Sequence, residues 1–397
     1  MLFRPPELDP SETRVVGEIE QLRESLTYAM GQPKRWFGLL RRNTFARNVR
    51  GSNTIEGYNV TKDDAVAAVE DEEPIDPKDE AWMAVTGYRA AMTYVLQKAE
   101  DPFFAFSPEL LKALHFMMLG YDLSKRPGRW RPGPIFIRDE ATGEQVYEGP
   151  PMELVPGLVA ELIEDIGRPS DLPRVIQAAM AHLNLVMIHP FSDGNGRMGR
   201  CLQTLVLARA GVLAPIFSSI EEYLGRNTRP YYDVLAAVGH GAWHPERDSR
   251  PWIRFCLTAH FRQAVTLARR TREIQKLCDE LEVVVRRVRL PERSVLALAD
   301  AALGYKVRNP TYRKAADVTD TVASRDLLAL VKAGLLEPKG EKRGRLYTAS
   351  ELVLDIRRKI AEPKNVPDPF TEPEEATKKA AAAGVNLVLP GMEEPTP

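Results

Sequence analysis

The stretch His189–Arg200, HPFSDGNGRMGR, decides how the rest of this sequence is interpreted. An apolar helical pattern ends at His189, and another begins near Arg197. The Gly-Asn-Gly loop between them would let backbone N–H groups converge on an anion at the amino terminus of the second helix. Arg197 and Arg200 are spaced so that both project from one face of its first turn. Together, these features predict a polyphosphate-binding site.

Two more side chains add chemistry to this segment. Asp193 would repel bare phosphates, so its carboxylate is better suited to a divalent cation that bridges them. His189 lies where its imidazole could take a proton from an attacking group. The GxxxxGK[ST] pattern of a Walker loop is absent. A Gly-Asn-Gly loop alone is usually a turn, and a lone histidine is usually a capping or core residue. Their combination predicts a nucleotide site with Mg²⁺ and a general base.

The bulk composition excludes several classes of protein. The 397 residues are enough for two or three domains, and 44% hydrophobic with 27% charged residues is ordinary for a globular chain. A formal net charge of −1 means that any basic patch for nucleic acid must be local. No apolar run approaches the roughly 18 residues of a membrane helix, and the amino terminus lacks a signal-peptide pattern. Three scattered cysteines without a CxxC pair exclude a structural zinc site. We therefore expect a cytoplasmic protein without a membrane partner.

Hydrophobic periodicity predicts a mainly α fold. Helical spacing recurs through most of the first 290 residues, and Thr61 and Ser107 are expected to cap two of these helices. The one convincing hairpin in this part of the chain spans residues 133–148. Its first strand is predicted at Ile135, Phe136 and Ile137.

Residues 290–360 resemble a winged helix-turn-helix, a small α+β domain. Short helices are followed by two strand-like runs around a turn rich in Lys and Arg, and Thr319 or Asp320 can cap the second helix. The inward face of that helix is expected to carry Val322, Leu327, Leu328 and Val331. Residues 286–360 hold 17 Lys and Arg against 9 Asp and Glu. This balance is compatible with DNA contacts, and equally with a solvated surface for protein docking or dimerisation.

The stretch HPFSDGNGRMGR resembles the signature of the Fic (filamentation induced by cAMP) family, HxFx(D/E)GNGRxxR, at every defined position. Fic proteins usually transfer AMP from ATP, with Mg²⁺ or Mn²⁺, onto a hydroxyl side chain of a target protein. The resemblance covers roughly residues 1–270 and implies a mainly α Fic helical core with one β-hairpin flap. In this family the flap binds the extended backbone of the target as an added strand. For the hairpin 133–148, a purely structural role is the alternative.

The resemblance assigns a role to each residue of the motif. His189 would be the base that deprotonates the target Ser, Thr or Tyr, and Phe191 would anchor the loop in the core. Asp193 would hold the metal, and Arg200 would orient the γ-phosphate. The nucleotide-binding set implied by the family is Asp193, Gly194, Asn195, Gly196, Arg197 and Arg200. Within RPYYDVL, Tyr231 and Tyr232 resemble the residues that contact adenine and ribose; their alternative role is as plain core aromatics.

The segment SNTIEG, residues 52–57, resembles the inhibitory motif of the same family, [S/T]xxxE[G/N], through Ser52, Glu56 and Gly57. Taken alone, it would be a helix end with a glycine stop and a solvated acid. Its position before the core implies the class with an amino-terminal inhibitory helix. We expect Glu56 to pair bidentately with Arg200 and so keep this arginine from the γ-phosphate. Tyr58 departs from the family pattern, in which many relatives carry Asn.

The leading hypothesis is an autoinhibited protein adenylyltransferase that also modifies itself. One alternative is a DNA-binding regulator whose Fic domain senses nucleotide, although an intact His189 argues against a pure sensor. Another is a hydrolase that removes AMP, with Glu56 activating water. A homodimer could control how Glu56 reaches Arg200. The expected regions are an amino-terminal helical region 1–110, a Fic core 111–270, a linking helix 271–289, a winged helix-turn-helix 290–360 and a disordered tail 361–397.

Overall fold

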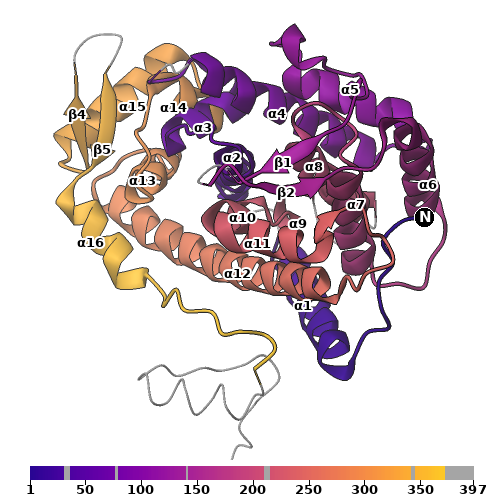
Figure 1. Ribbon diagram of the computed structural model, residues 1–397. Coiled ribbons are helices and arrows are strands. Elements are labelled where there is room, and N and C mark those ends of the chain that lie inside the picture. Colours follow the sequence, from indigo (N-terminus) through magenta and orange to yellow (C-terminus); the bar gives the residue numbers. More distant parts are fainter. Residues whose placement is uncertain (31–35, 77–78, 140–141, 210–214, 341–344, 372–397) are drawn as a thin grey trace, which may run out of the picture.

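The computed structural model describes residues 1–30, 36–76, 79–139, 142–209, 215–340 and 345–371. Within these ranges the protein is mainly helical, as the periodicity predicted (Figure 1). The first helices are α1 (Pro10–Met30), α2 (Phe37–Ile55), α3 (Lys62–Glu70), α4 (Asp79–Ala99), α5 (Pro108–Leu119), the 3₁₀ turns η1 (Leu123–Lys125) and η2 (Met152–Leu154), α6 (Val155–Gly167) and α7 (Arg174–Ile188). They are followed by α8 (Asn195–Arg209), α9 (Pro215–Ser218), α10 (Glu221–Arg226), α11 (Thr228–Gly239), α12 (Arg250–Arg287), α13 (Ser294–Ala302), α14 (Asn309–Ala316), α15 (Asp320–Lys332) and α16 (Glu351–Ile360).

The centre of the fold is the helical pair α7 and α8. Nearly every residue of both helices is buried, and α2, α4 and α12 pack around them. The two helices approach closely at Gly199, where a Cβ would lie 2.6 Å from Cδ2 of His182. Because this pair is enclosed on all sides, the short loop between α7 and α8 is held in one conformation.

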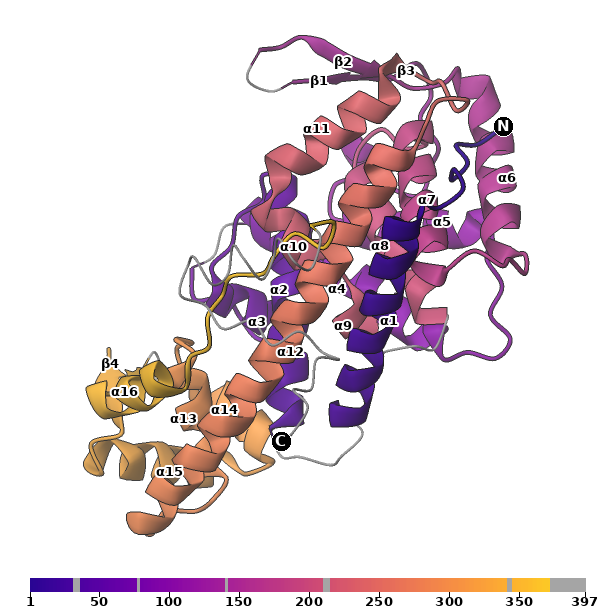
Figure 2. The same ribbon diagram turned by 90° about the horizontal axis from the view of Figure 1, so that it is seen from below.

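The helix α12 runs the length of the molecule (Figure 2). It packs along α1, and it contacts α7, α10 and α11 as well as α13 and α16. The expected break between a core helix ending at residue 270 and a linking helix 271–289 is therefore wrong, because one apolar face continues through both parts. Leu267, Ile274 and Leu281 are all buried at helical spacing across the expected boundary.

The predicted hairpin is present as two short strands. β1 (Phe136–Arg138) pairs antiparallel with β2 (Gln145–Glu148), and β2 also pairs in parallel with a two-residue strand β3 (Gly241–Ala242). The sheet order is β1-β2-β3, so β1 is an edge strand. β3 was not anticipated, because two residues are too short to give a period.

Three predicted helix caps are confirmed. The side chains of Thr61, Ser107 and Thr319 accept hydrogen bonds from the backbone N–H of Asp64, Leu110 and Val322. In α15, however, Leu328 is 44% exposed, so its expected place in the core is wrong. The buried apolar residues of this helix are Ala323, Leu327 and Leu330.

The carboxy-terminal unit α13–α16 includes the second hairpin, β4 (Leu336–Lys339) with β5 (Leu346–Ala349). Several of its basic side chains are paired within the protein. Arg308 pairs with Glu72 and Lys314 with Glu70, both from α3 or its end. Arg293 pairs with Asp326. This pairing reduces the charge available for DNA, and the winged-helix and DNA-binding assignments stay predictions. Residues 341–344 of the expected basic turn lie outside the described residues.

The first part of the expected disordered tail is packed. The Glu362 carboxylate pairs with Arg272 and Lys276 of α12, and the Pro369 carbonyl accepts a hydrogen bond from Arg14 of α1. Residues 372–397 lie outside the described part of the chain. None of the described helices is both long and apolar enough to cross a bilayer.

Candidate active site

The loop between α7 and α8 is closed by its own side chains. The Asn195 amide accepts from the Phe191 backbone N–H and donates to the Phe191 carbonyl, both at 2.9 Å. The Phe191 ring is fully buried and stacks on His115, with centroids 3.8 Å apart. His115 in turn contacts the Asp193 carbonyl through Nε2 at 3.0 Å. Gly194, with φ of +77°, makes the sharp turn into α8. The expected anchoring role of Phe191 agrees with this packing.

His189 ends α7 in a left-handed conformation. Its Nδ1 lies 3.1 Å from the Val186 carbonyl, and its own carbonyl accepts from Nε of Arg131 at 2.9 Å. A carbonyl can only accept, so Nδ1 carries the proton and Nε2 keeps its lone pair. Burial lowers the pKa of His189 to about 4, and the charge of Arg131 acts in the same direction. The imidazole is therefore neutral at pH 7 and able to take a proton.

Arg197 is buried without a hydrogen-bond partner. Its side chain is 0% exposed, and none of its three guanidinium nitrogens makes a hydrogen bond to a described residue. The nearest carboxylate oxygen is Oδ1 of Asp193, at 4.0 Å. The Tyr58 ring lies over the guanidinium at 5.1 Å. A buried cation without acceptors is costly, so this arrangement suits an anion that would supply them.

Arg200 lies one turn further along α8, and the guanidinium edge formed by Nε and one terminal nitrogen is fully hydrogen-bonded. Its Nε donates to the Ser52 hydroxyl at 2.7 Å, and one terminal nitrogen donates to the Ser52 carbonyl at 3.0 Å and to Oε1 of Glu56 at 2.6 Å. The pairing with Glu56 is thus through a single carboxylate oxygen, and the expected bidentate geometry is wrong. Ser52 instead accepts from Nε and shares the terminal nitrogen that binds Glu56. Although burial opposes the charge, Glu56 raises the pKa of Arg200.

The Glu56 carboxylate also covers the amino terminus of α8. A Cβ on Gly196 would lie 2.5 Å from Oε1 of Glu56. The carboxylate therefore occupies the space above the first turn, which is where an anion would approach the backbone N–H groups. Gly57, with φ of +81°, ends α2 immediately after Glu56, as the glycine stop predicted.

Asp193 lies at the rim of the site and is half-buried. Its Oδ1 accepts from the Gly194 backbone N–H at 2.6 Å, and its Oδ2 pairs with Nζ of Lys125 at 3.2 Å. No group of three or more His, Cys, Asp or Glu suited to a metal occurs among the described residues. A single carboxylate is nevertheless a common protein ligand of Mg²⁺, since phosphates and waters complete its shell.

The two tyrosines of α11 have different surroundings. Tyr231 is buried, its hydroxyl lies 3.0 Å from Nε2 of His182, and its ring lies 6.0 Å from the Arg200 guanidinium. Tyr232 is 45% exposed and donates to the Ile55 carbonyl at 3.2 Å. Both tyrosines border the inhibitory helix and α8, but Tyr231 is a core aromatic and only Tyr232 is open to a ligand.

Of the expected flap residues, Phe136 and Ile137 lie on the edge strand β1, and Ile135 lies just before it. Phe136 is 45% exposed, whereas Ile135 and Ile137 are half-buried; Ile137 packs on the core. The outer edge of β1 has no neighbouring strand among the described residues, so its backbone can accept an added one.

Three site residues escaped the sequence analysis. Lys125 donates to the Tyr58 hydroxyl at 2.8 Å and pairs with Asp193, so Tyr58 links the inhibitory segment to the rim. Arg131 holds the His189 carbonyl. The cluster of basic residues before the hairpin was a weak signal for Lys125 and Arg131, and Tyr58 was noticed only as a departure from the family pattern.

The comparisons with known proteins agree with this geometry. The family model described as Fic/DOC family matches residues 105–207, which include the entire loop between α7 and α8. Residues 105–207 are therefore similar to a Fic/DOC domain. Relatives named protein adenylyltransferase Fic include one from Nematostella vectensis, 28% identical over 54% of this chain and 46% of the relative. Another, from Drosophila mojavensis, is 26% identical over 62% of this chain and 45% of the relative. The chain thus spans less than half the length of these two relatives.

Solved structures share the fold of this chain. A Fic family protein from Desulfovibrio desulfuricans G20 has a TM-score of 0.55 at 21% identity, over 88% of this chain and 99% of its own. Fic-1 from C. elegans has a TM-score of 0.52 at 20% identity, over 65% of this chain and 72% of its own. At this level of identity the likeness concerns the fold alone.

Proposed function

We propose that this chain is an autoinhibited protein adenylyltransferase, which transfers AMP from ATP to a Ser, Thr or Tyr hydroxyl of a target protein and of itself. The observation that carries the proposal is the Arg197 guanidinium, which is buried near the amino terminus of α8 and makes no hydrogen bond to a described residue; its nearest carboxylate, that of Asp193, is 4.0 Å away. It lies in the same short loop as the neutral base His189. A phosphate-binding cation and a proton acceptor are the two groups that this transfer needs.

In the proposed reaction, Nε2 of His189 takes the proton of the target hydroxyl. The hydroxyl oxygen then forms a bond to the α-phosphorus of ATP, and the bond to the oxygen that bridges the α- and β-phosphates breaks, so pyrophosphate leaves. The Val186 carbonyl keeps His189 in the tautomer with Nε2 free, and Arg131 fixes its backbone. Arg197 would bind the phosphates. Positioning and charge stabilisation would supply most of the rate.

The residues also fit a divalent cation, Mg²⁺ or Mn²⁺, bound together with the nucleotide. Asp193 would hold the ion through its exposed carboxylate oxygen, after Lys125 releases it. When bound, the ion would neutralise phosphate charge. The flap strand β1 would hold the target backbone beside the site, with Phe136 as its exposed side chain.

Inhibition would come from Glu56. Its carboxylate lies above the first turn of α8 and binds Arg200, so a γ-phosphate would meet a like charge and lose a donor. ATP could then bind only in a pose in which the α-phosphorus is misaligned. The hydrogen bonds that Arg200 donates to Ser52 hold the arginine where it meets Glu56, so Ser52 would support the block that Glu56 provides.

The test is incorporation of label from α-labelled ATP, with Mg²⁺ or Mn²⁺, into the purified protein. We expect Glu56→Gly to raise labelling strongly over the wild type, and Glu56→Gly/His189→Ala to lose it by about 10²–10⁴-fold, the usual contribution of a general base. Glu100→Gly is the matched control, because Glu100 is an exposed acid just after the end of α4.

Each half of the proposal can fail separately. Equal labelling of the wild type and Glu56→Gly would refute autoinhibition. Labelling that survives His189→Ala would refute the assigned base. No label in any variant, in folded protein and with both metals, would refute transfer of AMP to the chain itself.

A further inference from the structure

A second cationic cavity lies on the opposite side of α2 from the catalytic loop. It has a volume of about 340 Å³ and is formed between α2, α3, α10 and the end of α13. Its charged lining consists of Arg47, Arg50, Lys62, Arg226 and one carboxylate, Glu222. The volume is at the lower end of the range for small-molecule sites, so a compact ligand is favoured.

The packing of α2 against α10 explains why this cavity exists. Gly51 of α2 lies against Gly225 of α10, and a Cβ at Gly51 would lie 2.5 Å from the Glu221 carbonyl oxygen. The two helices therefore touch along their backbones. The long side chains on either side of this contact leave a hollow between them. Leu303 and Tyr305 of the carboxy-terminal unit close this hollow.

The one carboxylate of the lining is already neutralised. Both oxygens of Glu222 bind Arg270, at 2.5 and 2.8 Å, and Oε1 also binds Arg226 at 2.6 Å. Although burial opposes ionisation, these arginines lower the pKa of Glu222 to about 2, so it is charged and fully used. The charge of Glu222 is thus shared among several arginines, Arg47 included, and cannot balance all the cations of the cavity.

Three cations of the lining have no carboxylate within ion-pair distance among the described residues: Arg47, Arg50 and Lys62. Arg50 donates only to the Val60 carbonyl. Arg47 and Lys62 both face the Tyr305 ring, at 6.0 and 5.1 Å from its centroid. Burial and the neighbouring positive groups lower the pKa of Lys62. Cations held together in this way repel each other unless an anion joins them.

We propose that this cavity is a second anion site, which binds a compact diphosphate group. A single monovalent anion cannot neutralise the combined charge of several converging cations. A diphosphate carries several negative charges and enough acceptor oxygens for all of them. Tyr305 is buried and its ring already faces two cations, so it offers no free surface on which a nucleotide base could stack. A free diphosphate therefore fits better than the same group within a nucleotide. This site does not depend on the proposed transferase activity.

The probe is pyrophosphate, and the measurement is isothermal titration calorimetry at fixed ionic strength. All proteins carry Arg197→Ala, so that the catalytic loop does not contribute the binding. In this background we expect one site per chain, and Arg50→Ala/Lys62→Ala should weaken binding by at least about 10-fold, since it removes two converging cations. Lys62→Ala alone, which removes an exposed side chain, should give a smaller loss and tests the site if the double variant does not fold.

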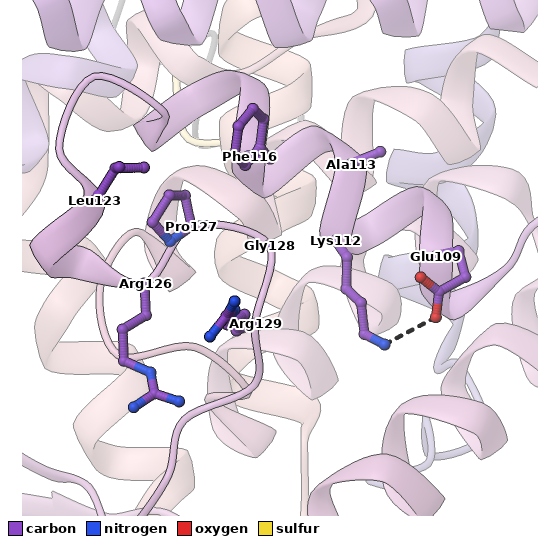
Figure 3. Close-up of a pocket in the computed structure, with 9 residues that line it drawn as sticks. All are labelled: Glu109, Lys112, Ala113, Phe116, Leu123, Arg126, Pro127, Gly128 and Arg129. Carbon is purple, nitrogen blue, oxygen red and sulfur yellow. Dashed lines mark hydrogen bonds and ion pairs between the residues drawn. The ribbon is translucent and has the colours of Figure 1, made fainter.

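The matched control is Arg126→Ala/Arg129→Ala, which removes the same charge from a different cavity (Figure 3). That cavity lies beside α5, and Arg126, Arg129 and Phe116 are among the residues that line it. Binding that is unchanged by this pair and weakened by Arg50→Ala/Lys62→Ala supports the proposal, and binding unchanged by both pairs overturns it. Binding lost by this pair but kept in Arg50→Ala/Lys62→Ala, or no binding in the Arg197→Ala background, overturns it. ADP is titrated in the same way. If the site binds a free diphosphate, pyrophosphate should bind more tightly than ADP. If it binds a diphosphate within a nucleotide, ADP would bind equally well.

Discussion

The amino-terminal half of α8 presents two buried arginines in opposite states. Arg197 has no hydrogen-bonded partner among the described residues, whereas Arg200 is held by Ser52 and Glu56. Both guanidinium groups are at most 1% exposed, so the difference is not one of solvent. The difference lies in the side chains that α2 and the residues at its end bring to each arginine. Arg197 is left able to bind an added anion, whereas Arg200 is covered by an acid of the same chain.

The largest test of this contrast is Arg197→Ala in the Glu56→Gly background. We expect labelling from ATP, measured as kcat/KM, to fall by about 10²–10³-fold, the usual cost of losing one preorganised donor to a developing charge. Arg209→Ala is the control, because Arg209 ends the same helix, is exposed, and contacts the Ala99 and Asp101 carbonyls and the Phe104 ring. A fall of less than about 10-fold would show that Arg197 does not grip the phosphates.

The second test compares the stability of the two arginine variants without nucleotide. Arg200→Ala should lower the free energy of unfolding by about 1–3 kcal/mol, because it strands the buried hydroxyl of Ser52 and the Glu56 carboxylate. Arg197→Ala should lower it less or not at all, since it removes a buried cation without acceptors. Urea denaturation measures both. The reverse order would mean that Arg197 has partners that hold the fold.

A smaller effect is expected for Ser52→Ala. The substitution removes the hydrogen bond from Nε of Arg200 and leaves Glu56 in place. The loss of about 1 kcal/mol should weaken the inhibited arrangement and raise labelling by roughly 5-fold. Thr54→Ala, on the other face of α2, is the control. Labelling equal to the wild type would mean that Ser52 does not support the inhibitory contact.

The smallest expected change is with pH. The pKa of His189 is lowered to about 4 by burial, so the base form is lost only as the pH falls through that value. For Glu56→Gly, kcat/KM should therefore change by less than about 2-fold between pH 7.5 and 5.5. An unperturbed histidine, with a pKa near 6.5, would lose about 10-fold over the same range. Circular dichroism at each pH separates titration from unfolding.

Local patterns predicted much of the fold and the site. The caps at Thr61 and Ser107 and the hairpin 133–148 were readable because each depends on a few adjacent residues. The same holds for the loop from His189 to Arg200, whose spacing sets its geometry. The continuity of α12 was missed because its charged second half hides an apolar face that only packing against α13 and α16 makes evident. Leu328 was wrongly assigned to the core. Helical spacing predicts which residues share a face of the helix, but not which residues at the edge of that face are covered by another element.

The sequence by itself determined which residues could do the chemistry, because the signature and the inhibitory motif are contiguous and their backbone geometry is local. Only the tertiary structure decided how they combine. Glu56 and Arg200 are far apart in the chain, and their single-oxygen contact, with Ser52 beside it, depends on how closely α2 packs on α8. Tyr58 over Arg197 and the cations around Tyr305 are likewise contacts between distant segments. Such contacts follow from packing and burial, which no local pattern encodes.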